Sequence, residues 1–257
     1  QEGWSFSGYL AEKKKRDADK YEADKAYWKA VTADWKTGSE LPLAARPESI
    51  SNAEYHRQQM VISAADYQSL KEDAAKNHTT IAMLLLTLYA NVLSRWSGSN
   101  DFLMNIPLFN RDLSLRGSEY AVADFTELLL LDLHTDTSLS LADAADAIRQ
   151  NFYARYDHSA FGGMAVQKML TASGKGAGIS APVVFSCTEG IELISGKCAE
   201  LFGRTGFMLT QTPQVYIDFQ TFQSGDDLIC IWDPSSERAA TNLRKAGQSM
   251  RRLMGRS

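Results

Sequence analysis

The chain has 257 residues, of which 44% are hydrophobic, and its formal net charge is −4. This length suits one large domain or two small ones with a sizeable core, and an acidic chain without a concentrated basic face argues against nucleic-acid binding. The three cysteines show no C-x-x-C spacing, which argues against a disulfide framework and favours a cytoplasmic location. No apolar run reaches the roughly 18 residues of a membrane span, so no membrane partner is expected.

Hydrophobic patterning changes between helical and strand periods along the chain. The predicted elements are, in chain order, a helix at 17–35, an extended Pro-bounded linker at 41–47, a strand at 56–62, a helix from 63, a helix at 79–96, strands at 102–108 and 128–131, helices at 140–156 and 162–172, strands at 182–187, 205–210, 213–222 and 226–233, and a helix at 236–254. Helices that can cross over between parallel strands favour an α/β fold, with a mixed sheet and helices packed on it.

Local signals support several of these elements. Ser63 with Asp66 three residues later forms a capping-box-like helix start. The continuous apolar run Leu128–Leu131 is typical of a strand covered on both faces, and Gly225 begins a hairpin-like turn between the last two strands. The basic run Lys13–Arg16 is interpreted as a solvated helix face.

Metal chemistry is not expected. The four histidines, among them His134 and His158, show no metal-ligand spacing, and His158 by itself is interpreted as a helix-end residue. No G-x-S-x-G nucleophile elbow is present.

Asp218 is the most unusual polar residue of the predicted strands. It shares one face of an alternating strand with Tyr216 and Gln220, and Ile217 and Phe219 lie on the other face. Taken alone, this alternation favours a second face that is simply solvated. A buried carboxylate with a raised pKa can instead relay protons during addition to a carbonyl and loss of water.

Ser186 ends the apolar strand at residues 182–186, where a hydroxyl is most often only a strand terminus. On a strand next to that of Asp218, the two side chains can face one cleft. The hydroxyl can then orient the carboxylate or hold a developing oxyanion.

Seven segments carry recognisable motifs: Leu41-Pro42 with Pro47 after the helix of Tyr27-Trp28, Thr80–Ser97, Pro107–Arg111, Asp124-Phe125-Thr126 before the apolar run, Pro182–Ser186, Thr210–Gln220, and Ile231-Trp232-Asp233. In this order they resemble the motifs of the heterocyclisation domains of non-ribosomal peptide synthetases. The T-P-Q-V-x-x-D pattern at 212–218 separates that family from ordinary condensation domains.

The resemblance implies a fold like chloramphenicol acetyltransferase, in which two similar lobes form a V around a catalytic tunnel. Residues 51–257 correspond to the C-terminal lobe, and residues 1–50 to a helix and linker leading into it. The D-x-x-x-x-D motif of the family belongs to the first lobe, which the resemblance places outside this chain. The first residue is Gln rather than Met, and a processed or excised fragment is therefore expected.

The implied reaction condenses a carrier-bound acyl or peptidyl thioester with carrier-bound Cys, Ser or Thr, and then cyclodehydrates the product to a thiazoline or oxazoline. By resemblance, Asp218 is the acid/base of cyclodehydration, and Ser186 stands where the family usually has Thr. Weaker candidates for the substrate tunnel are Asn110, Asp124, Thr212, Gln214 and Gln220. The chain also departs from the family at Pro107, Ala123 and Phe219.

The resemblance further implies that no cofactor is bound directly, because the substrates arrive on the phosphopantetheine arms of carrier domains. The implied partners are the upstream and downstream peptidyl carrier domains, an adenylation domain and the first lobe. Siderophore-like products are common in the family. Two alternatives stay open: a non-catalytic module that docks carrier domains, and a condensation domain that forms only the amide.

Overall fold

The computed structural model describes residues 4–35, 41, 57–173, 181–191, 195–203, 207 and 215–234. Its helices are α1 (Phe6–Arg16), α2 (Ala18–Val31), η1 (Thr32–Asp34), α3 (Ala64–Lys76), α4 (Ile81–Ser97), η3 (Ser118–Tyr120), α5 (Leu141–Tyr156), α6 (Gly163–Ala172) and α7 (Gly196–Phe202). Its strands are β1 (Gln58–Ile62), β2 (Asp101–Phe109), β3 (Thr126–His134), β4 (Val183–Cys187), β5 (Ile217–Ser224) and β6 (Asp227–Pro234). None of the helices in this part of the chain has the length and apolar character to span a bilayer.

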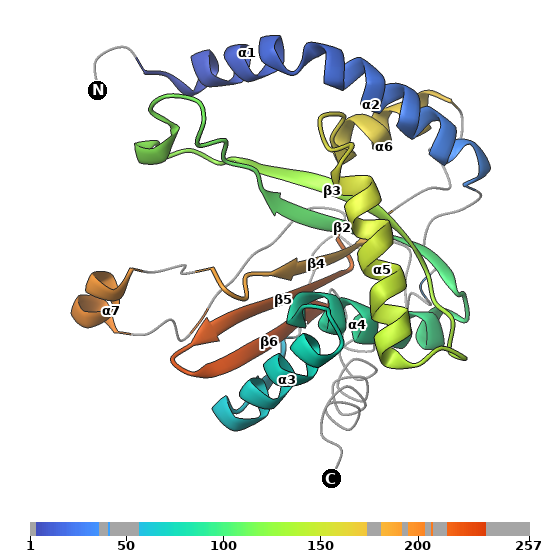
Figure 1. Ribbon diagram of the computed structural model, residues 1–257, viewed down its shortest axis with the longest axis vertical. Coiled ribbons are helices and arrows are strands. Elements are labelled where there is room, and N and C mark those ends of the chain that lie inside the picture. The colour runs from blue at the N-terminus through green and yellow to red at the C-terminus, as the bar shows by residue number, and fades with distance from the viewer. Residues whose placement is uncertain are drawn as a thin grey trace, which may run out of the picture.

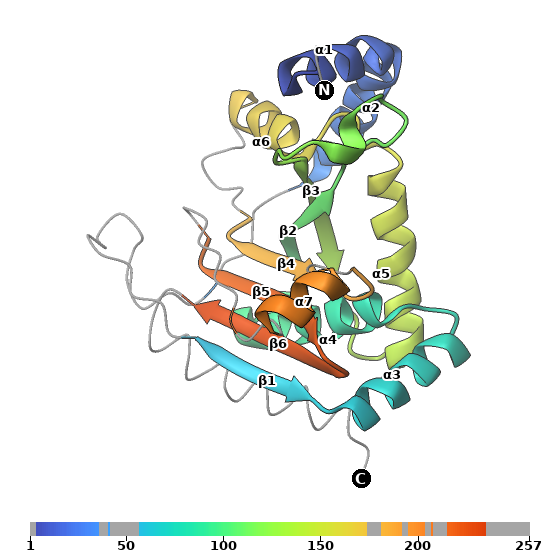
Figure 2. The same ribbon diagram turned by 90° about the vertical axis from the view of Figure 1, so that its left-hand side faces the viewer.

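The described strands form one mixed sheet in the order β1-β6-β5-β4-β2-β3 (Figures 1 and 2). Strand β4 runs parallel to both of its neighbours, β2 and β5. The remaining pairs, β1 with β6, β5 with β6 and β2 with β3, are antiparallel. The predicted α/β fold with a mixed sheet is therefore confirmed.

Helix α4 forms the centre of the core on one face of the sheet. The hydroxyl of Thr80 accepts a hydrogen bond from the N–H of Met83 at 3.2 Å and caps its start, and Gly98, with φ of 71°, ends it in the left-handed region. The ring of Tyr89 stacks on that of Phe219 of β5 at a centroid distance of 4.9 Å. The side chains that alternate with Phe219 along β5 therefore lie on the face of the sheet opposite α4.

Helices α1 and α2 lie nearly end to end along one side of the molecule, next to α6 (Figure 1). The carboxylate of Asp24 is 1% exposed and accepts hydrogen bonds from His158 Nδ1 at 2.9 Å and from the N–H of Ala160 at 3.0 Å. The indole N–H of Trp28 donates to the carbonyl of His158 at 2.9 Å. His158 thus joins α2 to the segment after α5, and its place just beyond that helix agrees with the helix-end interpretation.

Several predicted elements are confirmed with small shifts. Ser63 caps α3 by accepting a hydrogen bond from the N–H of Asp66 at 3.3 Å. The run Leu129–Leu131 is at most 1% exposed, so this strand is covered on both faces, and Gly225 has a φ of 65° in the turn between β5 and β6.

Other predictions need correction. The helix face predicted at Lys13–Arg16 belongs to α1, but the start of this helix at Phe6 was not expected, because Tyr9 is the buried residue among its eleven and its sequence is strongly polar. The strand predicted from residue 213 begins only at Ile217, because Tyr216 donates its N–H to the carbonyl of Pro182 before the ladder starts. Beyond Leu41 and Phe207, which lie in no helix or strand, the predicted linker at 41–47, the strand at 205–210 and the helix at 236–254 lie outside the described residues, as does the proposed boundary at residue 50.

Candidate functional site

The candidate site lies on the sheet face opposite α4. In the parallel pair of β4 and β5, Val184 is the register partner of Asp218, and Ser186 is the partner of Gln220. Register partners project from the same face, and residues two apart on a strand share it. The two predicted catalytic residues, Asp218 and Ser186, therefore lie on one face of neighbouring strands, and Ser186 is two residues beyond the register partner of Asp218.

The face that carries Asp218 is buried. Asp218 is 8% exposed and Gln220 is 3% exposed. The side-chain amide of Gln220 donates to Oδ2 of Asp218 at 2.5 Å. The solvated face favoured from alternation alone is therefore wrong, because alternation assigns side chains to a face without revealing what covers it. Gln220, a weaker candidate from sequence, directly orients the carboxylate.

An apolar cluster continues the same face away from Asp218. Phe222, Ile229 and Ile231 are each at most 8% exposed and pack together. Such surroundings favour the neutral form of a nearby carboxylic acid over the charged form. The site thus combines an oriented acid with a poorly hydrated flank.

Two charged residues next to Asp218 are not among the predicted site residues. Asp233 of β6 is the antiparallel register partner of Asp218 and is 3% exposed. Arg57, just before β1, donates to Asp233 through Nε at 2.8 Å and Nη2 at 2.5 Å. The hydrogen bonds to Asp233 raise the pKa of Arg57 above its usual value, and the charge of Asp218 adds to the effect. The Trp-Asp motif pointed to Asp233, whereas Arg57 carries no local signal.

A hydrogen-bonded pair of side-chain amides, of which Asn105 is buried, lies further along this face. Asn105 of β2 is the register partner of Val184, and its side chain donates to the carbonyl of Ala181 at 2.7 Å. Gln167 of α6 donates to Oδ1 of Asn105 at 3.1 Å. The pair orders the entry to β4 and, with it, the strand that carries Ser186.

The other predicted tunnel residues are not brought to Asp218. The side chain of Asn110 donates to Glu127 at 2.8 Å, and Asp124 accepts from the N–H of Thr126 at 2.8 Å. Hydrogen bonds from Thr126 lower the pKa of Asp124 below its usual value. Both residues belong to the connection between β2 and β3, with Asn110 about 16 Å further along the chain than Asn105 at the usual rise of a strand. Thr212 and Gln214 lie outside the described residues.

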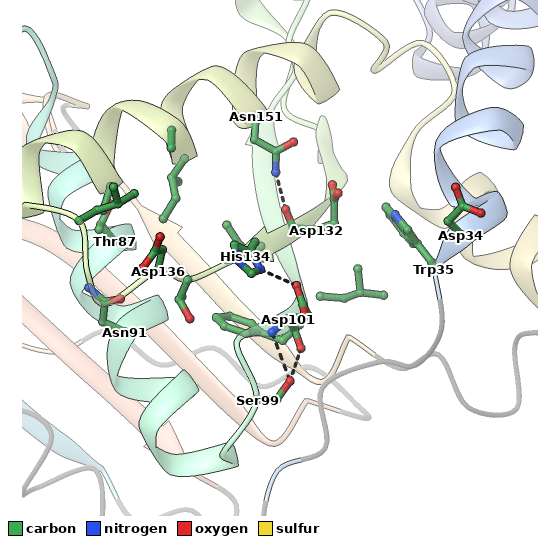
Figure 3. A pocket seen from close by; sticks show the side chains of 18 residues that line it. Asp34, Trp35, Thr87, Asn91, Ser99, Asp101, Asp132, His134, Asp136 and Asn151 are labelled. Carbon is green, nitrogen blue, oxygen red and sulfur yellow. Dashed lines mark hydrogen bonds and ion pairs between the residues drawn. The ribbon is translucent and has the colours of Figure 1, made fainter.

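A separate cavity of about 720 Å³ opens between α4, α5 and the far ends of β2 and β3 (Figure 3). His134 and Asp101 pair across its lining at 2.7 Å, and both side chains are more than two-thirds exposed. The side chain of Asn151 donates a hydrogen bond to the backbone carbonyl of Asp132 in the same lining (Figure 3). Its lining contains neither Asp218 nor Ser186, so the cavity is distinct from the candidate site. In the described part of the chain, no group of three or more His, Cys, Asp or Glu side chains could hold a metal ion.

Comparisons with known proteins agree with this architecture. Residues 2–186 match the model of the condensation domain family. Pyochelin synthetase PchE of Pseudomonas aeruginosa is 34% identical over 89% of this chain, and the match spans 16% of that protein. Phenyloxazoline synthase MbtB of Mycobacterium tuberculosis is 36% identical over 60% of this chain and 11% of its own length. The chain thus spans about a sixth or less of the length of these two relatives.

Among solved structures, the cyclization-docking bidomain of the EpoB non-ribosomal peptide synthetase from Sorangium cellulosum has the same fold. It superposes with a TM-score of 0.82 and 24% identity, over 98% of this chain and 52% of that one. This agrees with the predicted lobe of a fold like chloramphenicol acetyltransferase. Together with the motifs and the mixed sheet, the family match shows that the chain belongs to the condensation domain family, as its resemblance to non-ribosomal peptide synthetase domains predicted.

Proposed function

We propose that this chain is part of a heterocyclisation domain of a non-ribosomal peptide synthetase. The domain joins a carrier-bound acyl or peptidyl thioester to carrier-bound Cys, Ser or Thr and closes the product to a thiazoline or oxazoline. The observation that carries the proposal is the buried carboxylate of Asp218, held by Gln220 on the same sheet face as Ser186. The names of its relatives, a pyochelin synthetase and a phenyloxazoline synthase, support the cyclising branch of the family.

In the first stage, the amine of the acceptor amino acid attacks the thioester carbonyl. A C–N bond forms, the C–S bond breaks, and the donor thiol leaves with a proton. This stage needs the two thioesters to be held together more than it needs a strong acid. The donor and acceptor arrive on the phosphopantetheine arms of carrier domains, so no cofactor of the chain itself is required.

In the second stage, Asp218 acts as acid and base. It takes the proton of the attacking thiol or hydroxyl, whose sulfur or oxygen bonds to the amide carbonyl carbon, and passes that proton to the former carbonyl oxygen, which becomes a hydroxyl. Asp218 then takes the N–H proton as the C=N bond forms and gives it to the hydroxyl, which leaves as water when its C–O bond breaks. A carboxylic acid serves both directions when its pKa lies near the working pH, which the buried, apolar surroundings favour.

Gln220 and Ser186 have positioning roles in this scheme. Gln220 donates a hydrogen bond to one oxygen of Asp218. Because the carboxylate is planar and rigid, this bond also restricts the direction of the second oxygen. The hydroxyl of Ser186 can donate to the oxygen that develops charge during ring closure. The branched side chain of a Thr is more restricted about χ1 than that of Ser, and Ser186→Thr is therefore expected to keep or improve the yield of ring.

The test is mass spectrometry of products formed on loaded carrier domains by the full synthetase. Asp218→Asn is expected to leave the condensed amide and to stop the loss of water, with the ring yield falling by about 10²-fold or more. The exposed-site variant Glu22→Gln serves as the matched control, and Ser186→Thr tests the positioning role of the hydroxyl. An unchanged ring yield in Asp218→Asn rules out the acid/base role. We expect the 257-residue chain by itself to form no product, because the proposed tunnel needs a second lobe.

A second candidate is a condensation domain that forms only the amide. The family match favours it, since that family model describes condensation without naming ring closure. Its product retains the water, and Asp218→Asn then leaves the product mass unchanged. Carrier binding without any turnover in the full synthetase would identify a docking module instead.

A further inference from the structure

An acid pair lies at the centre of the candidate site. Asp218 of β5 and Asp233 of β6 are direct register partners in an antiparallel pair, so their Cβ atoms lie about 4.5–5.5 Å apart on one face. Both are buried, at 8% and 3% exposure. Two like charges placed directly opposite each other destabilise a sheet, and more so away from water. The pair therefore needs a counter-charge or a shared proton.

Arg57 supplies that counter-charge, and its direct ion pair is with Asp233. Its guanidinium grips both oxygens of Asp233, at 2.8 and 2.5 Å, in the forked geometry that makes Arg–carboxylate pairs strong and directional. The ring of Phe207 lies 4.4 Å from the guanidinium carbon, which fixes the guanidinium from a second direction. Asp218 is oriented separately by Gln220.

The other groups that face Asp218 among the described residues are neutral. Val184 and Ser186 of β4 lie beside it on the same face, and Ile231 of β6 is the register partner of Gln220 on that face. Tyr89 is stacked on Phe219 on the opposite face of the sheet. Arg57 and Asp233 are thus the charged neighbours of Asp218 in the described part of the chain.

We propose that Arg57 and Asp233 act as a fixed ion pair whose balance sets the protonation state of Asp218, and that they are positioning residues for the acid/base step. With Arg57 in place, the ion pair offsets the carboxylate of Asp233 that lies opposite Asp218. Without Arg57, that carboxylate faces Asp218 with no counter-charge from Arg57, and a like charge nearby disfavours the ionised form of Asp218. This inference rests on the proposed function for its catalytic meaning, while the electrostatic coupling stands on the geometry alone.

The experiment is a pH titration of the full chain labelled with ¹³C at the aspartate carboxyl carbon and followed by NMR, with the Asp218 signal assigned by Asp218→Asn. Arg57→Gln is expected to raise the pKa of Asp218 by about one unit or more. Asp233→Asn is expected to lower it, because the cation stays and the neighbouring anion is gone. Arg57→Lys should restore part of the shift, since the charge returns without the fork.

The matched control is Arg149→Gln, which removes a cation paired with Asp146 within α5 and should leave the Asp218 titration in place. A change of less than about 0.3 unit in Arg57→Gln, with the fold intact by circular dichroism, overturns the proposal. If Arg57→Gln does not fold, Asp233→Asn decides: an unchanged or raised pKa of Asp218 overturns it equally. A purely structural tie between β1 and β6 would change stability and leave the titration as it is.

The same variants in the full synthetase link the coupling to catalysis. The pH profile of water loss should move in the direction of the Asp218 titration, while the profile of amide formation stays in place. If the titration moves and water loss does not follow, the proposed role of Asp218 fails and the electrostatic coupling stands. If neither moves, the coupling itself fails.

Discussion

Phe219 offers a direct test of the face assignment on which the site depends. Its side chain is fully buried and points under α4, away from Asp218, where it lies 4.9 Å from the ring of Tyr89 and 4.8 Å from that of Trp232. Phe219→Ala is expected to lower the free energy of unfolding by about 3–5 kcal/mol, from lost burial and the cavity left behind. That is a large share of the roughly 5–15 kcal/mol that stabilises a typical domain.

Urea unfolding of the full chain, followed by tryptophan fluorescence and far-ultraviolet circular dichroism, measures this loss. Phe109→Ala is the matched control, because Phe109 is 57% exposed and should cost less than about 0.5 kcal/mol. If the two variants lose equal stability, Phe219 is not in the core and the assignment of Asp218 to the opposite face is wrong. Phe219→His should cost about 1–3 kcal/mol, because a polar ring enters an apolar stack.

Three further predictions concern the packing of the fold. Gly163→Ala should destabilise the chain by about 1–3 kcal/mol, because a Cβ there would lie 2.7 Å from the carbonyl oxygen of Leu128. Asp24→Ala should cost about 1–3 kcal/mol in urea unfolding, because it leaves the half-buried donors of His158 and Ala160 without their acceptor. The pKa of Asp112 is lowered to about 2, first by its hydrogen bond from Ser114. The stability that the ionised carboxylate adds is therefore present above its ordinary pKa near 4 and is lost as the pH falls toward 2. Acid unfolding of Asp112→Ala, compared with the wild type, should reveal this loss.

The controls for these predictions come from neighbouring positions. A Cβ at Gly162 meets nothing nearer than 3.8 Å, so Gly162→Ala should be tolerated where Gly163→Ala is not. Glu22, exposed on the same helix as Asp24, should lose less than about 0.5 kcal/mol as Glu22→Ala. Equal losses within either pair contradict the packing described here. An unchanged acid transition in Asp112→Ala contradicts the third prediction.

The sequence predicted best where the local signals were strong. The helix at 79–96 was placed to within two residues because a wide apolar stripe lies between the Thr80 cap and Gly98. Helix α7 was missed, because it is short and none of its seven residues is buried. A short exposed helix has no amphipathic pattern to detect.

The residues of the candidate site also differ in how well they can be predicted from the sequence. Asp218 and Gln220 lie in one motif and were found together, whereas the pairing of Arg57 with Asp233 joins residues 176 positions apart. No periodicity or spacing rule reaches across such a separation. Burial of the Asp218 face was also hidden, because it depends on what the rest of the chain lays over the sheet.

The pairing of β1 with β6 has a consequence for how this chain is made. Gln58 meets Trp232 in the register, so β1 leaves the ribosome about 170 residues before its partner. At roughly 5–20 residues per second, the strand waits on the order of 10–35 seconds with its backbone donors and acceptors unpaired. An unpaired strand is a template for association with other chains, so the recovery of folded protein should fall as the concentration of refolding chains rises. Arg57, immediately before β1, places a charge at the edge of this unpaired strand until Asp233 is synthesised and pairs with it.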